Sequence, residues 1–180
     1  MEYAYELKIP KERVAVLIGK NGEVKQEFEE FTSSKIDVDS KEGDVKITGN
    51  DSIKLYSARE VVKAIGRGFN PEIARLLLKQ DYSLEIISLQ DYVKNKKNHF
   101  ERVKGRVIGR EGKARGMIEQ LTNTFISVYG KTVSIIGDSE GVFLAKKAVE
   151  SILQGSPHNN VYMFLEKARK RRKEEELKDL

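Results

Sequence analysis

The chain of 180 residues contains one internal repeat, and this repeat limits the folds that it can adopt. Residues 16–22, Val-Leu-Ile-Gly-Lys-Asn-Gly, match residues 106–112, Arg-Val-Ile-Gly-Arg-Glu-Gly, at an offset of 90 positions. The match extends to Ile65 in the first copy and Ile152 in the second, with the offset falling to 88 and then to 87. Such internal similarity indicates that each copy is one structural unit. The sequence therefore predicts two small domains of the same fold.

The apolar pattern within each copy predicts its helices and strands. After the first glycine pair, Val24, Phe28 and Phe31 have the spacing of an amphipathic helix. Short alternating segments then predict two strands, near residues 36–38 and 45–49. A last helix follows in each copy.

A strand and a helix are also predicted before each glycine pair. Residues 3–9 alternate with a period of two, and Leu84 and Ile86 offer a shorter version of this strand in the second copy. Pro10 suits the first turn of the helix that follows. The order β-α-α-β-β-α thus occurs twice. We expect an α+β fold with two three-stranded sheets, each covered by three helices on one face.

Glycine and proline residues divide the chain into segments. Asn70-Pro71 is typical of a helix start, so we expect a helical connector that packs between the domains through an apolar face. The expected segments are a first domain at 1–68, a connector at 69–81, a second domain at 82–155 and a C-terminal basic helix or tail at 156–180.

The two Gly-x-x-Gly segments have a chemistry suited to phosphate. Glycine lacks a Cβ, so a phosphate backbone can approach the chain closely. Free N–H groups at the start of the following helix attract an anion. Lys20 and Arg110 place a base between the glycines of each pair. KH domains hold about four single-stranded nucleotides in this way.

Both copies resemble the KH fold of the eukaryotic type, type I, in their order of elements. Residues 64–69, 104–113 and 152–157 closely resemble the tandem KH factor of small-subunit ribosome maturation. This family, also called Dim-two, is the KH partner of the Nob-one PIN-domain endonuclease. The likeness runs from the first strand to about Tyr162 and is to the archaeal type.

The resemblance implies a function. It implies a single-stranded RNA-binding factor for small-subunit assembly, which binds near the 3′ end of precursor small-subunit rRNA and assists endonucleolytic maturation. The partners that we expect are this RNA, a PIN-domain endonuclease and a translation initiation factor.

RNA contacts are predicted around both loops. In the second domain they are Lys104, Arg106, Ile108, Gly109, Arg110, Glu111, Gly112, Lys113 and Arg115. In the first domain they are Ile18, Gly19, Lys20, Asn21, Gly22 and Lys25. Ile18 and Ile108 are expected to line an apolar groove for bases. Val38 and Val128 either read base edges through their backbone or pack in the core, and their alternating pattern favours the core.

Charge distinguishes the two copies. Residues 1–90 contain 14 bases and 16 acids, whereas residues 91–180 contain 19 bases and 12 acids. Nine bases and two acids lie between Lys94 and Arg115. A field of one sign attracts a polyanion. We therefore expect the second domain to supply most of the RNA affinity, and the first either to bind weakly or to serve as a protein-contact surface.

Several classes of function find no support in the sequence. Cysteine is absent and there are two histidines, so a disulfide, a Cys-ligated zinc or thiol catalysis is excluded. Asp37 and Asp39 have no third metal ligand nearby, and neither a P-loop nor a catalytic triad can be assembled. We predict that the protein is not an enzyme and binds no cofactor or metal. No apolar run approaches about 18 residues, and no apolar leader follows Met1, so we expect a cytoplasmic protein with no membrane partner.

Two alternatives stay open at this point. The protein is either an RNA-binding assembly factor or an adaptor whose KH folds dock mainly to a nuclease, an initiation factor or ribosomal proteins. The tail has six bases in residues 167–173, followed by three glutamates. It is either an arm that contacts RNA or a helix end with solvated charges.

Overall fold

The computed structural model describes residues 1–93 and 97–180. The chain divides into two compact units, Met1–Leu84 and Glu85–Leu180. Two of the bases counted above, Lys94 and Lys96, lie outside the described residues.

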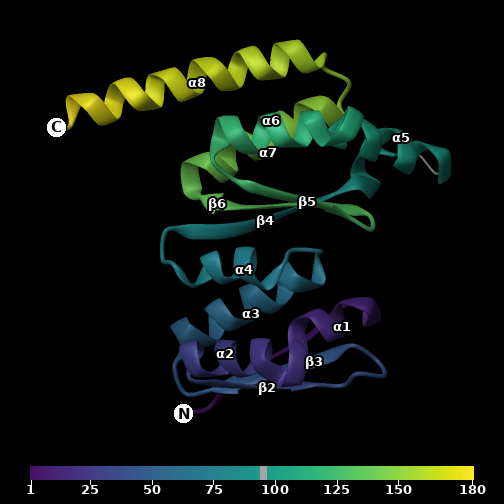
Figure 1. The fold of residues 1–180 in the computed structure, drawn as a ribbon, viewed down its shortest axis with the longest axis vertical. Helices are drawn as coiled ribbons and strands as arrows, with labels where there is room; N and C mark the ends of the chain where they lie inside the picture. Colours follow the sequence, from purple (N-terminus) through teal and green to yellow (C-terminus); the bar gives the residue numbers. More distant parts are fainter. Residues whose placement is uncertain (94–96) are drawn as a thin grey trace. The chain divides into compact units, whose positions relative to one another are not determined.

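The first unit has the predicted order of elements. They are β1 (Tyr3–Lys8), α1 (Lys11–Ile18), α2 (Glu23–Thr32), β2 (Ser34–Val38), β3 (Asp44–Gly49) and α3 (Ser52–Gly66). The sheet is antiparallel with the order β1-β3-β2, which leaves β2 at an edge. The three helices lie on one face of this sheet (Figure 1). The alternation of each strand puts its apolar side chains under them, and Phe28 of α2 is fully buried there.

The connector belongs to the first unit. It forms two short helical segments, α4 (Pro71–Ala74) and η2 (Arg75–Leu78), and both pack against α3. Arg75 also pairs with Glu27 of α2 at 2.6 Å. Asn70 holds the predicted N-cap position, but its side chain makes no capping hydrogen bond. The compact unit therefore continues to Leu84, beyond the end predicted for the first domain.

The second unit repeats the fold and adds a helix. Its sheet begins with β4 (Tyr82–Ser88), whose first three residues still belong to the first compact unit. The elements that follow are η3 (Leu89–Tyr92), α5 (Lys97–Ile108), α6 (Lys113–Thr122), β5 (Phe125–Tyr129), β6 (Thr132–Asp138), α7 (Ser139–Leu153) and α8 (His158–Lys178). The strand order is β4-β6-β5, the counterpart of the order in the first unit. β4 extends on both sides of Leu84 and Ile86, the two residues that predicted it, and Ile87 is its buried residue.

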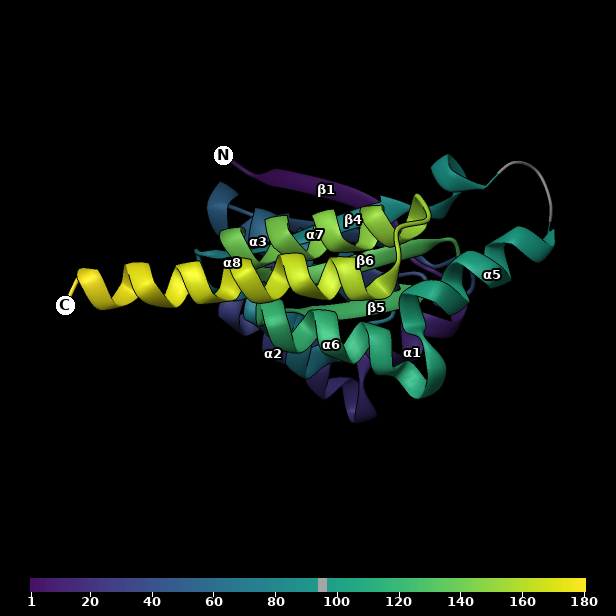
Figure 2. The ribbon, with the colours of Figure 1, turned by 90° about the horizontal axis from the view of Figure 1, so that it is seen from above.

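The C-terminal helix is part of the second unit's core. Val161 and Leu165 of α8 are buried in the same apolar cluster as Ile118 and Leu121 of α6. Figure 2 shows α8 lying along α6 and α7 and continuing past their ends. The C-terminal segment, predicted as a helix or tail after the second domain, is therefore a 21-residue helix anchored by its first half.

Candidate nucleic-acid interface

The two Gly-x-x-Gly loops have the same backbone geometry. The first glycine has φ 75° and ψ 175° in Gly19, and φ 74° and ψ 175° in Gly109. Gly22 and Gly112 have φ values of 78° and 75°. A backbone with positive φ and ψ near 180° is essentially restricted to glycine. The repeat seen in the sequence is thus a repeat of one loop conformation.

The residue between the glycines is also unusual. Asn21 and Glu111 have φ values of 55° and 56°. Asparagine tolerates this left-handed conformation, but a glutamate there is disfavoured because its Cβ crowds the backbone. The second loop therefore holds Glu111 in a strained position on its exposed side.

The two glycines of each pair have different surroundings. A Cβ on Gly19 or on Gly109 would overlap the residue five positions later, and at Gly109 it would lie 2.6 Å from the Cβ of Ala114. A Cβ on Gly22 or Gly112 would meet nothing within 4 Å. The first glycine is required for packing against the next helix. The second faces open space, where a ligand has room to approach.

The helices α2 and α6 begin directly after the second glycine. Neither has a side-chain cap at its N-terminus, so the N–H groups of the first turn face the loop without a side-chain acceptor. The first turn of α2 contains Glu23, whereas that of α6 contains no acid and begins with Lys113. The electrostatics at this position favour an anion more strongly in the second unit.

A groove of about 370 Å³ lies beside the first loop. It brings together four residues that the sequence analysis singled out, namely Ile18, Gly22, Lys25 and Val38. Ile18 and Val38 are half-buried rather than enclosed in the core, so both present apolar surface to the groove. Val128, the counterpart of Val38, is likewise half-buried and packs against the core cluster of the second unit.

The structure adds a carboxylate that the sequence analysis missed. Glu119 pairs with the Nε of Arg115 at 3.6 Å and accepts a hydrogen bond from the N–H of Ile126 at 3.0 Å. The first unit repeats the arrangement, with Glu29 pairing with Lys25 at 3.5 Å. Each carboxylate thereby holds a base beside its loop and satisfies an N–H group of the edge strand. The offset of 90 between the two glutamates was the available signal.

The bases predicted around the second loop fall into two groups. Arg110, Lys113 and Arg115 are exposed. Arg106 is half-buried, and its guanidinium donates to the carbonyl oxygens of Ile152 at 3.0 Å and Ser156 at 2.9 Å.

The structural role of Arg106 differs from that of the loop bases, because it holds the end of α7 and the turn that follows. Lys104 is also largely covered, and its Nζ lies 3.9 Å from Glu101.

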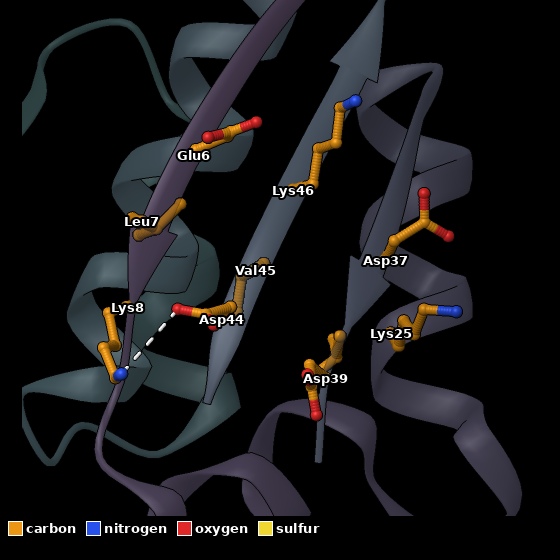
Figure 3. Close-up of a pocket in the computed structure, with 10 residues that line it drawn as sticks. Glu6, Leu7, Lys8, Lys25, Asp37, Asp39, Asp44, Val45 and Lys46 are labelled. Carbon is orange, nitrogen blue, oxygen red and sulfur yellow. Dashed lines mark ion pairs between the residues drawn. The ribbon is translucent and has the colours of Figure 1, made fainter. Parts of the chain in front are cut away.

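A wider hollow of about 880 Å³ lies over the exposed face of the first unit's sheet, and residues of its three strands and Lys25 of α2 line it. Figure 3 shows Glu6, Lys46 and Asp37 on neighbouring strands, with acid and base alternating. Among the residues that the structure describes, no group of three or more potential ligands could hold a metal ion. Asp37 and Asp39, considered above as a metal pair, lie exposed on this face.

No helix in the described ranges is both long enough and apolar enough to span a membrane.

Comparison with known families agrees with this architecture. Residues 83–170 match the eukaryotic-type KH domain, KH-domain type I, and residues 4–65 match the KH domain. The chain is therefore a tandem type I KH-domain protein, which confirms the predicted α+β fold. It is 50% identical to the KH domain-containing protein MJ0443 of Methanocaldococcus jannaschii over 169 residues. This match covers 92% of this chain and 74% of that protein.

Two further relatives define the family more closely. A chain in the crystal structure of an a/eIF2alpha-aDim2p-rRNA complex from Pyrococcus horikoshii matches with a TM-score of 0.89 and 45% identity, covering 94% of this chain and 96% of that chain. The pre-rRNA-processing protein PNO1 of Debaryomyces hansenii is 32% identical over 125 residues, which cover 69% of this chain and 49% of that protein. The match thus spans about half of PNO1. The chain belongs to the tandem KH family that includes Dim2p and PNO1.

Proposed function

We propose that this protein binds single-stranded RNA near the 3′ end of precursor small-subunit rRNA and assists its endonucleolytic maturation during small-subunit assembly. The observation that carries the proposal is the repeated loop geometry, in which the second glycine of each pair faces open space beside a helix start without a side-chain cap. The relatives support the context, because PNO1 is named a pre-rRNA-processing protein and the aDim2p structure contains rRNA.

Each part of the loop has a defined task in this proposal. The phosphate backbone passes over the second glycine, Gly22 or Gly112, where a side chain would stand in its path. Lys20 and Arg110 contribute positive charge, and the N–H groups of α2 and α6 add the positive end of a helix dipole. In the first unit, the nucleobases of the RNA lie against Ile18 and Val38 in the groove. KH domains hold about four nucleotides each, so the two loops together engage about eight.

Both loops bind RNA in this proposal, but not equally. Lys113 opens α6 and Arg115 follows, whereas Glu23 opens α2 and weakens the attraction for phosphate there. Each contact between a phosphate and a lysine or arginine releases counterions and increases the salt dependence of binding. The second loop therefore supplies the larger electrostatic share of the affinity.

The chain's role in maturation is to hold the RNA for another protein. A PIN-domain endonuclease would make the cut, and a translation initiation factor would be a second partner. The name of the Pyrococcus complex supports the latter, because that structure contains a/eIF2alpha with aDim2p. We place this role in the cytoplasm.

Fluorescence anisotropy tests RNA binding with three RNAs, each at two salt concentrations. One RNA matches the 3′ end of small-subunit rRNA, the second is its scramble and the third is a duplex. The loop variants are Lys20→Asp with Asn21→Asp, and Arg110→Asp with Glu111→Asp. Lys147→Glu on the exposed side of α7 is a control for the latter variant, because both change the net charge by about two units.

The proposal predicts tight binding of the matched RNA, weakened by either loop variant and more by the second, with little effect of the control. Equal binding of all three RNAs would show that the interaction depends on phosphate charge alone and not on RNA sequence or single-strandedness. Absence of binding at low salt would contradict the proposal and favour an adaptor that docks mainly to proteins.

A further inference from the structure

The two units differ in what covers one face of their helices. In the second unit, α8 lies on α6 and α7, and Val161 and Leu165 join the cluster that buries Leu121 to 9% exposure. The repeat makes Phe31 of α2 the counterpart of Leu121, and Phe31 is 62% exposed. The connector that follows α3 ends after eight helical residues, so the first unit has no counterpart to the full length of α8.

An open groove of about 520 Å³ occupies this place on the first unit, and we call it the Phe31 groove. Its walls come from the end of α2, the first half of α3, the end of η2 and residues 79–84, which include the start of β4. Ile53 and Tyr56 of α3 also line it, and they are 74% and 52% exposed. Three large exposed apolar side chains in one concavity are typical of a docking surface.

Asp51 lines the same groove, and its counterpart in the second unit, Asp138, holds α8. Asp138 caps α7 through the N–H of Gly141 and pairs with Arg172 of α8 at 2.6 Å. Asp51, its counterpart at an offset of 87, caps α3 by accepting from two backbone N–H groups, at 3.0 and 3.1 Å. Asp51 lines the Phe31 groove. The first unit therefore leaves uncovered the counterparts of Leu121 and Asp138, whereas the connector packs on the remainder of α3 and buries Ala74 and Leu77 there.

We propose that the Phe31 groove binds a basic amphipathic helix of a partner protein. The helix presents two apolar residues one turn apart, followed two turns later by an arginine, in the manner of Val161, Leu165 and Arg172. The apolar pair packs against Phe31 and the apolar lining beside it, and the arginine pairs with Asp51. The other acid of the groove, Glu60, is already engaged by Arg59 and Lys63, at 3.4 and 3.7 Å.

This site is distinct from the proposed RNA site. The Phe31 groove shares no lining residue with the groove beside the first loop. The protein can therefore hold RNA and a partner helix at the same time, and the inference does not depend on the RNA proposal.

The test uses the full chain and a synthetic peptide of residues 158–173, which carries the required pattern. Amide NMR spectra follow the titration, so that the perturbed residues are identified directly. We expect saturable shifts centred on Phe31, Ile53 and Tyr56. Phe31→Ser weakens binding by at least about tenfold, as expected for an apolar anchor. Phe143→Ser, at the corresponding exposed aromatic of α7, leaves it unchanged.

The charge pairing has its own test. Asp51→Asn removes the charge but keeps a good helix cap, so α3 stays intact. This variant and a peptide with Arg172→Gln should each weaken binding several-fold. Combining the two should add little, because both remove the same pair.

Three results would overturn the proposal. They are the absence of shifts in the Phe31 groove, shifts confined to α6 and α7 because the peptide displaces α8, and shifts of the Phe31 groove when a single-stranded RNA is added without the peptide. The last result would make the groove a nucleic-acid surface.

Discussion

The glycines of each loop serve two purposes at the scale of single residues. Gly109 lies where only glycine fits, against Ala114 and with a backbone that other residues avoid. Gly112 needs only its left-handed φ, because the space around it is open. Packing thus requires the first glycine, and the proposed ligand requires the second.

This difference predicts the effect of alanine at each position. Gly109→Ala should lower the free energy of unfolding by about 2 kcal/mol or more, since the new Cβ overlaps Ala114 and the backbone is strained. Gly112→Ala should cost only about 1 kcal/mol, from the left-handed φ alone. Urea unfolding of both variants measures this. Equal losses of stability would show that the surroundings of the two glycines do not matter.

Glu111 is a second residue whose effect is predictable. Glu111→Asn gives the second loop the residue that the first loop has, and asparagine tolerates the positive φ. We expect the free energy of unfolding to rise by about 0.5–1 kcal/mol. Removing the acid should also tighten RNA binding at low salt.

Urea unfolding and anisotropy check the two effects of Glu111→Asn separately. Weaker binding of the matched RNA, with no change for its scramble, would instead show that Glu111 recognises a base.

Some residue roles could not be predicted from the sequence. The sequence placed Arg106 among the loop bases, because its position in the repeat lies three residues before Gly109. Its partners are carbonyl oxygens 46 and 50 positions further along the chain, and no local pattern reveals such contacts. The repeat pairs Glu119 with Glu29, but only the structure shows that Glu119 accepts a hydrogen bond from the N–H of Ile126 in the edge strand.

At the scale of elements, α8 is the main addition to the repeated fold. Leu165 is 1% exposed in the core cluster, whereas its neighbour Phe164 is 42% exposed. Leu165→Ala should lower the free energy of unfolding of the second unit by about 2–5 kcal/mol, and Phe164→Ala should have little effect. Hydrogen exchange, which reports each unit separately, measures the change. Equal protection in both variants would contradict the packing of α8.

The second half of α8 is held by an ion pair between Arg172 and Asp138. The stability of the second unit therefore depends on pH. Burial raises the pKa of Asp138, but hydrogen bonds from Arg172 and from the N–H of Gly141 outweigh it and hold the pKa below the usual 3.8. A carboxylate with a lowered pKa stabilises the folded state above its usual pKa, and this contribution is lost as the pH falls through the folded value. The contribution should therefore be complete at pH 7 and decline only below about pH 3.8.

Asp138→Asn isolates this contribution because asparagine still caps α7. The difference in unfolding free energy between the wild type and this variant should be constant from pH 7 to 5 and shrink below pH 3.8. Denaturant unfolding at a series of pH values measures it. A difference that persists at pH 2 would mean that the ion pair with Arg172 is not its source.

Most elements could be predicted because their apolar patterns repeat. The C-terminal helix was harder, since its sequence suggested charge more than packing. Val161 and Leu165 are only two apolar anchors in front of a basic run, and only the fold shows that α6 and α7 present a surface for them. For the same reason, the sequence left the role of the basic run open.

At the scale of the whole molecule, one fold is used twice with different surfaces. Both units carry the same loop, the same carboxylate beside it and the same capped last helix. They differ in charge, because bases exceed acids only in the second half of the chain. They also differ in what packs on their helices, because α8 lies on the second unit and the Phe31 groove stays open on the first. This asymmetry suits a protein that binds RNA through both units and a protein partner through one.

Cross-linking tests the central claim, that both loops contact single-stranded RNA, most directly. An RNA that matches the 3′ end of small-subunit rRNA and carries 4-thiouridine is irradiated with the full chain, and mass spectrometry identifies the modified residues. We predict two clusters of cross-links, one within residues 18–25 and one within residues 108–115, each lost in the corresponding loop variant. Cross-links confined to the basic run 167–173 of α8 would contradict the account.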